Sequence, residues 1–163
     1  MTAARTALVT GSARGIGRAI ARALHASGHA VTGLDILEQD PDDLAAAITA
    51  DLADPAVPAR IVTAHGPIDI LVDNAALFIH KPLAEFTLDD FDRTIAVNLR
   101  ATFLLAQAAA PAMAERGWGR IVNISSVGAR TGGHLPVGRV QRDQGGHHLA
   151  HQEFRPQLPV VPA

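Results

Sequence analysis

The peptide Thr10-Gly11-Ser12-Ala13-Arg14-Gly15-Ile16-Gly17 joins an apolar run to a segment, Ile16 to Leu24, whose apolar residues recur at helical spacing. A strand, a glycine-rich loop and a helix in this order can hold a pyrophosphate. Gly11 allows a tight turn, Gly15 lets the backbone approach phosphate, and Gly17 lets the helix pack closely on the strand. Amides at the helix start then face the anion. A glycine-rich loop alone is equally compatible with a plain turn.

A second apolar run, residues 30–35, ends in Asp35. This acid is near the offset of about 20 residues at which a carboxylate accepts hydrogen bonds from an adenosine ribose. Its charge would repel a ribose phosphate, which favours NAD over NADP as the cofactor. Arg14 weakly favours NADP, because a guanidinium can pair with that phosphate. The alternative for Asp35 is a solvated strand end.

Strands and helices alternate along the rest of the first four-fifths of the chain. Residues 68–72 and 120–126 have the composition of strands, and Thr87 with Asp90 forms a capping-box-like helix start. Asp40-Pro41-Asp42-Asp43 is expected to open a short helix. A long helix is expected over Ala101 to Glu115, which is almost uncharged and is therefore expected to be buried on most sides. This alternation predicts a doubly wound α/β fold, with an open, mostly parallel sheet covered on both faces.

The order of these motifs resembles the classical short-chain dehydrogenase/reductase family, whose fold is Rossmann-like. The matching residues, in order, are Thr10 to Gly17 for T-G-x-x-x-G-I-G, Asp51-Leu52 for an adenine-contacting acid, Asn74-Ala75 within N-N-A-G, Asn98, and Ser126 with its neighbour Ser125. The resemblance covers about Thr6 to Gly133. Two residues depart from the N-N-A-G pattern: Asp73 replaces its first asparagine, and Ala76 its glycine.

The resemblance implies cofactor-binding and catalytic roles for particular residues. The cofactor set is Thr10, Gly11, Ser12, Arg14, Gly15, Ile16, Gly17, Asp35, Asp51, Leu52, Asn74 and Ala75, and the catalytic set is Ser126 and Asn98. The family transfers a hydride between nicotinamide and a carbonyl or alcohol carbon. The serine bonds the substrate oxygen, and a tyrosine exchanges the proton, with its pKa lowered by a lysine four residues later. The partner is therefore expected to be a small-molecule substrate.

The tyrosine and lysine of that reaction are missing from this chain. The sequence has no tyrosine, and Lys81 is its sole lysine. The tyrosine should stand near Arg139 or Val140. We therefore expect no normal dehydrogenase turnover. Two alternatives to an oxidoreductase remain open: a module that binds NAD without turnover, and a product that neither binds nor catalyses.

A shifted reading frame can account for the loss. With third bases chosen freely, Arg139 to His148 can be written CGC GTA CAG CGC GAC CAA GGG GGG CAT CAT. Reading one base later gives Ala-Tyr-Ser-Ala-Thr-Lys-Gly-Gly-Ile, which contains the Y-x-x-x-K of the family. The hypothesis is a frameshift between about Gly132 and Arg139, so that the family domain is truncated and the sheet incomplete on its C-terminal side.

Composition changes abruptly after Gly133. We therefore expect one incomplete dinucleotide-binding domain over residues 1–133 and an irregular, disordered tail over 134–163. His147, His148 and His151 have a metal-like spacing, but no carboxylate or cysteine accompanies them, so out-of-frame sequence is favoured and no metal is expected.

Length and charge exclude other classes of protein. The 163 residues fit about one domain, and a net charge of −2 gives no basic excess for nucleic acid. Cysteine is absent, and no apolar run reaches the roughly 18 residues of a membrane helix. These features, and the lack of a signal-peptide pattern, predict a cytoplasmic protein that binds neither nucleic acid nor membrane. The helix around Ala101 to Ala114 would normally pack on the next helix of the family fold. Without that cover it is expected to expose an apolar face for homo-oligomerisation or aggregation.

Overall fold

The structure is a computed structural model, and it describes residues 4–126. Within them five strands form one sheet in the order β3-β2-β1-β4-β5, and every neighbouring pair is parallel. The strands are β1 Thr6–Thr10, β2 Ala30–Asp35, β3 Ala46–Thr49, β4 Ile70–Asp73 and β5 Arg120–Asn123. The chain runs outward from β1 to β3 and then returns to β4 on the other side of β1. The predicted doubly wound parallel sheet is confirmed.

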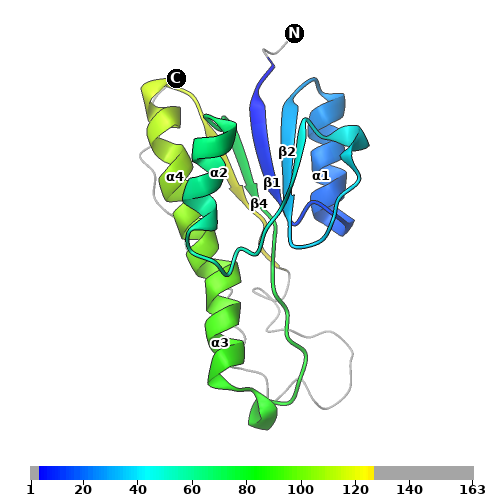
Figure 1. The fold of residues 1–163 in the computed structure, drawn as a ribbon, viewed down its shortest axis with the longest axis vertical. Helices are drawn as coiled ribbons and strands as arrows, with labels where there is room; N and C mark the ends of the chain where they lie inside the picture. Colours follow the sequence, from blue (N-terminus) through cyan, green and yellow to red (C-terminus); the bar gives the residue numbers. More distant parts are fainter. Residues whose placement is uncertain (1–3, 127–163) are drawn as a thin grey trace.

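Helices cover both faces of this sheet (Figure 1). Helix α1, Gly15–Ala26, packs on one face, while α2, Val57–His65, and α4, Ala101–Glu115, pack on the other. Side chains of alternating strand residues point to opposite faces, which divides the core into two clusters. The α1 side contains Ala7, Val9, Ala21, Val31 and Val72. The opposite cluster is larger and contains Leu8, Leu34, Leu71, Leu105 and Met113 among others.

Two elements were not predicted from the sequence. Strand β3 is four residues long and pairs with β2 alone, so its pattern is too short to stand out. Helix α2 follows Pro55 and has a second proline, Pro58, in its first turn, where a missing amide hydrogen is tolerated. The short helix expected at Asp40 is a 3-10 turn, η1 Pro41–Asp43, in which the Asp40 carboxylate accepts from the Asp42 amide at 3.2 Å.

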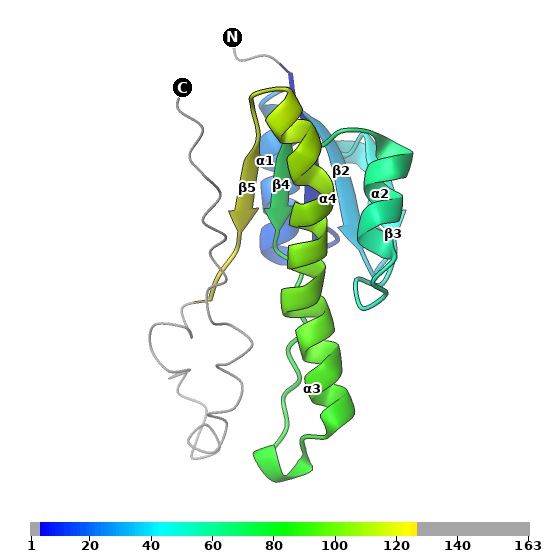
Figure 2. The ribbon, with the colours of Figure 1, turned by 90° about the vertical axis from the view of Figure 1, so that its left-hand side faces the viewer.

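Helix α3, Leu88–Ile95, continues into α4 through a π-helical turn, Ala96–Arg100. The predicted capping box is present, because the Thr87 hydroxyl accepts from the Asp90 amide at 3.2 Å and the Asp90 carboxylate accepts from the Thr87 amide at 2.8 Å. Helix α4 ends before Gly117, which has a left-handed φ of 66°. The α3 end of this long helix projects beyond the carboxyl ends of the strands (Figure 2).

The exposure of α4 corrects the expectation that it is buried on most sides. Helix α4 buries one side only, through Ala101, Leu105, Ala109 and Met113, and Phe103 is 46% exposed. Within residues 4–126, Leu88–Glu115 is also long and apolar enough to cross a membrane, with a mean hydropathy of 1.2 over its best window. The core helix of a soluble protein can have the same length and composition.

Candidate functional site

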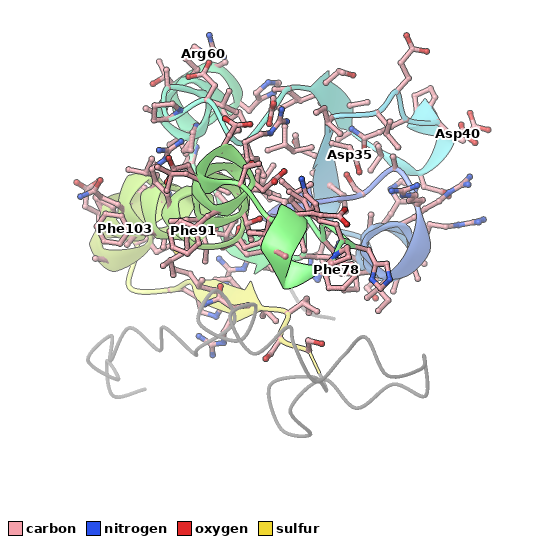
Figure 3. The ribbon with its side chains drawn as sticks, turned by 90° about the horizontal axis from the view of Figure 1, so that it is seen from below. Asp35, Asp40, Arg60, Phe78, Phe91 and Phe103 are labelled. Atoms are coloured by element: carbon pink, nitrogen blue, oxygen red, sulfur yellow. The ribbon has the colours of Figure 1, made fainter. Side chains whose placement is uncertain are left out.

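A cavity of about 390 Å³ opens at the carboxyl ends of the strands, beside the loop between β1 and α1. Ligands of open α/β sheets bind at such an edge, where neighbouring strands lead to opposite faces. Figure 3 looks onto this end of the molecule and shows Asp35 near its middle. The lining residues come from four segments: Gly11 and Arg14; Leu34 to Leu37; Ala50 to Leu52; and Asn74 to Leu77, with Arg93 and Val97 from the long helix.

The glycines of the loop differ in what they make possible. Gly11 has a φ of 68°, and a Cβ built there would lie 2.8 Å from Nδ2 of Asn74. At Gly17 a Cβ would collide with the carbonyl oxygen of Gly11, so the start of α1 approaches β1 closely. Gly15 has a φ of 57° but open space around it, so only backbone strain excludes other residues. The loop thus brings Arg14, the residue before α1, to the cavity. Amides at a helix start lack intrahelical partners and favour an anion.

Thr10 and Asn74 fasten this loop to the end of β4. The Thr10 hydroxyl, 1% exposed, accepts from the amides of Asn74 and Ala75, both at 2.9 Å. The Asn74 side chain donates in return to the carbonyl oxygens of Thr10 at 3.0 Å and Gly11 at 3.2 Å. Asn74 and Ala75 also line the cavity. The segment after β4 therefore forms one wall and fixes the loop at the same time.

Asp35 lies in the wall, at the end of β2, as its place in the sequence predicts. One carboxylate oxygen accepts from the Ala13 amide at 2.9 Å and the other from the Leu37 amide at 3.0 Å. Each oxygen has further lone pairs, so the group retains the capacity to accept hydrogen bonds from a ligand. Its charge is placed within the cavity by two bonds to backbone.

Asp51 and Leu52 lie in the same wall, after β3. Leu52 is buried, and the Asp51 carboxylate accepts from the Ala53 amide at 2.8 Å. Asp51 also pairs with Arg93 of α3 at 3.5 Å. Sequence reasoning missed Arg93, because an arginine on an exposed helix face gives no signal by itself. Arg14 and Arg93 therefore face Asp35 and Asp51 around one cavity.

Asn98 lies in the π turn and holds the segment that follows β4. Its Oδ1 accepts from the Leu77 amide at 2.7 Å, and its Nδ2 donates to the Leu77 carbonyl oxygen at 2.9 Å. Single π turns inside α-helices often occur at functional sites. Asn98 does not itself line the cavity, but Leu77 does.

Besides Asn98, six predicted residues lie outside the cavity lining: Thr10, Ser12, Gly15, Ile16, Gly17 and Ser126. Ser12 is 3% exposed, and its hydroxyl donates to Oε1 of Gln39 at 2.6 Å. Ile16 is 65% exposed at the start of α1. Ser126 is exposed just beyond β5. Lys81, the sole lysine, forms an ion pair with Asp90, which together with Thr87 lowers the pKa of that carboxyl to about 2. It is not among the residues that line the cavity.

Asp73, the residue that departs from the family pattern, is almost completely buried at the end of β4. It is 7% exposed, and its Oδ2 has no hydrogen-bond partner among residues 4–126. Burial raises the pKa of this carboxyl to about 7, because an ionised carboxylate there would lose its hydration without a compensating partner. At this position the asparagine of the family pattern would carry no such charge.

The expectations for the last part of the chain concern residues outside the described range. These are the irregular tail, the region around Arg139 and Val140, and the histidines His147, His148 and His151. Within residues 4–126, histidine, aspartate and glutamate side chains form no group of three suited to a metal ion.

Comparisons with known proteins agree with the fold. A family model described as short chain dehydrogenase matches residues 5–136. The chain belongs to the short-chain dehydrogenase family. The resemblance seen in the motifs is thereby confirmed, and with it membership of a family of oxidoreductases that bind nicotinamide cofactors.

Relatives and solved structures cover most of this chain. It is 39% identical to L-xylulose reductase of Bos taurus over 80% of this chain and 56% of the relative, and 42% identical to sorbitol dehydrogenase of Cereibacter sphaeroides over 78% and 55%. A 3-oxoacyl (acyl-carrier-protein) reductase of Agrobacterium tumefaciens, solved with NADP bound, has a TM-score of 0.72 at 32% identity, over 90% of this chain and 60% of that structure. The chain thus spans about half the length of these curated relatives.

Proposed function

We propose that this chain binds a nicotinamide dinucleotide in the cavity at the carboxyl ends of β1, β2 and β4. The observation that carries the proposal is the arrangement of the α1 N-terminus and Asp35 on one cavity. The helix start offers amides to a pyrophosphate, and Asp35 offers a carboxylate to ribose hydroxyls. Asp51 and Leu52 line the same cavity and would contact adenine, as the family pattern implies. The cofactor, when bound, would supply the hydride that the family exchanges.

NAD is the proposed form of this cofactor. Asp35 would repel a ribose phosphate, and two backbone amides hold its charge in the cavity wall. NADP is the second candidate, supported by Arg14 and Arg93 on the same cavity and by the relative solved with NADP. A carboxylate near the ribose favours NAD, whereas a guanidinium there favours NADP. Titration with NADH and NADPH side by side shows which cofactor binds more tightly.

We further propose that the chain as written does not turn over a carbonyl or alcohol substrate. A hydride transfer that leaves an alkoxide needs a proton donor, and the sequence has no tyrosine to supply it. Lys81 is paired with Asp90 and lies outside the cavity lining. Asn98 is engaged with the main chain of Leu77. We also propose that the protein is cytoplasmic. A form of the protein that has the tyrosine and the lysine would act on a small-molecule substrate.

The deciding experiment is titration of the purified chain with NADH, followed by nicotinamide fluorescence, with Asp35→Ala beside it. Saturable binding is expected, and it should weaken about tenfold in the variant, the effect of losing one charge-assisted hydrogen-bonding partner. Exposed Asp42→Ala is the matched control. A folded wild-type chain that binds neither NADH nor NADPH would contradict the proposal.

The DNA sequence provides a separate test of why the chain lacks the tyrosine and the lysine. A single-base change between the codons of Gly132 and Arg139 should restore a Y-x-x-x-K segment. The corrected gene product is then expected to reduce or oxidise substrates such as xylulose or sorbitol, the compounds in the names of the relatives, while the chain as written does not. Turnover by the chain as written would show that the missing tyrosine is not needed.

A further inference from the structure

The segment after β2 is fastened to the phosphate-binding loop by a residue that no motif includes. Gln39 lies four residues beyond Asp35, and its side-chain carbonyl accepts from the Ser12 hydroxyl at 2.6 Å. Its amide nitrogen donates to the carbonyl oxygen of Ile48, on β3, at 3.0 Å. Both polar atoms of the Gln39 amide are therefore used, one toward the loop and one toward the sheet.

The packing around Gln39 makes this contact specific. Gly33 of β2 lies directly beneath it, and a Cβ built at Gly33 would collide with Oε1 of Gln39 and lie 2.8 Å from the Ser12 hydroxyl. Glycine at this strand position thus leaves the space in which the two side chains meet. The Ser12 hydroxyl is buried, so loss of its acceptor would leave only the 3.4 Å contact with the Leu34 carbonyl oxygen.

Neighbouring contacts hold the same segment against α1. Arg18 pairs with Asp40 at 3.2 Å, and Arg22 pairs with Asp43 at 2.9 Å. Both pairs involve exposed side chains, and such surface pairs contribute little on their own. The bond between Gln39 and Ser12 is shorter and partly buried, so it is the contact expected to restrain the loop.

We propose that Gln39 is a positioning residue, which ties Ser12 to β3 and so holds Ser12-Ala13-Arg14 in place at the cavity. Ser12 and Ala13 are then restrained from both sides, by Gln39 and by Asp35. A loop held in its binding conformation loses less entropy when a ligand binds, which raises affinity. The restraint itself exists without cofactor, but its effect on affinity rests on the proposed dinucleotide site.

The test compares Gln39→Met, which keeps the length of the side chain and removes both hydrogen bonds, with Glu38→Met at the exposed neighbouring position. Arg14 lies within the loop, so limited digestion with trypsin reports on loop opening in the cofactor-free chain. Cleavage after Arg14 is expected to accelerate about fivefold in Gln39→Met, while cleavage after Arg60 in α2 stays unchanged. A factor of five corresponds to about 1 kcal/mol, a typical hydrogen-bond contribution.

A double-mutant cycle with Ser12→Ala identifies the partner. If Gln39 acts through Ser12, Gln39→Met should have much less effect on cleavage in the Ser12→Ala background. NADH affinity should fall about fivefold in Gln39→Met and remain at the wild-type value in Glu38→Met. Equal acceleration in both backgrounds, or unchanged cleavage after Arg14, would overturn the proposal. Failure of the wild-type chain to bind any dinucleotide would instead overturn the proposed function, while the cleavage result would still decide whether the restraint exists.

Discussion

Asn98 and Leu77 form a closed pair of hydrogen bonds, in which the side-chain amide of one residue meets both main-chain groups of the other. The two bonds are 2.7 Å and 2.9 Å long and join the long helix to the segment after β4. Asn98 was predicted as a catalytic asparagine, and in this structure it supports a wall of the cavity. In this structure the Asn98 side chain therefore holds Leu77 in place in the cavity wall.

Replacing Asn98 by aspartate should show how much this pair of hydrogen bonds contributes to stability. The carboxylate would place an oxygen against the Leu77 carbonyl oxygen where a donor now lies, so about 1–3 kcal/mol of stability should be lost. Urea unfolding measures this loss. The same amide-to-acid change at exposed Gln107 is the control and should have little effect. An Asn98→Asp variant as stable as the control would show that the pair does not contribute.

Asp73 should make stability depend on pH in an unusual direction. Its pKa is about 7 in the folded chain and near 3.8 when exposed, so folding favours the protonated form. The contribution is fully favourable below pH 4 and is lost as pH rises through 7, by an amount on the order of 4 kcal/mol. Asp73→Asn should therefore stabilise the protein at pH 8 and change it little at pH 4.

Thermal melts of the wild type and Asp73→Asn across this range test that sign. The difference between the two proteins should grow from pH 4 to pH 8, because only the wild type must bury a charge. Exposed Asp42→Asn should show no such trend. A difference that is constant with pH would mean that Asp73 is not held in its neutral form.

The glycines of the loop between β1 and α1 should respond unequally to alanine. Gly17→Ala would drive a methyl group into the Gly11 carbonyl and should abolish NADH binding or folding. Gly15→Ala meets open space and carries only the cost of a left-handed backbone, about 1–2 kcal/mol. Urea unfolding and NADH titration of both variants distinguish them. If both variants lost the same stability and NADH affinity, the close contact between Gly17 and the Gly11 carbonyl would not be what limits substitution.

Phe103 should promote self-association of the chain. It lies, with Ile95 and Leu99, around an apolar hollow of about 280 Å³ on the long helix, on the side away from Asp35 and Asp40 (Figure 3). Phe103→Ser should lower the average mass measured by sedimentation, because less apolar surface is removed from water on association. Gln107→Ser on the same helix is the control. An unchanged mass would assign any association to another surface.

The sequence predicts the parts of the site that depend on local pattern. The loop from Thr10 to Gly17 and the acid at Asp35 have fixed spacings, and the structure places them together. Arg93 and Gln39 have no such spacing, since they reach the site through tertiary contacts across the chain. Strand β3 was missed because four residues at the sheet edge bury too little to impose a pattern.

The π turn at Ala96–Arg100 sets the rotation of α3 relative to α4. Such a turn contains one residue more than an α-helical turn, and each residue of an α-helix corresponds to a rotation of about 100°. Deleting one residue there would rotate α3 by that angle relative to α4. Arg93 would then turn away from Asp51, while Leu105 and Met113 would keep their places in the core. Whether Arg93 belongs to the cavity wall therefore depends on the one extra residue of the π turn.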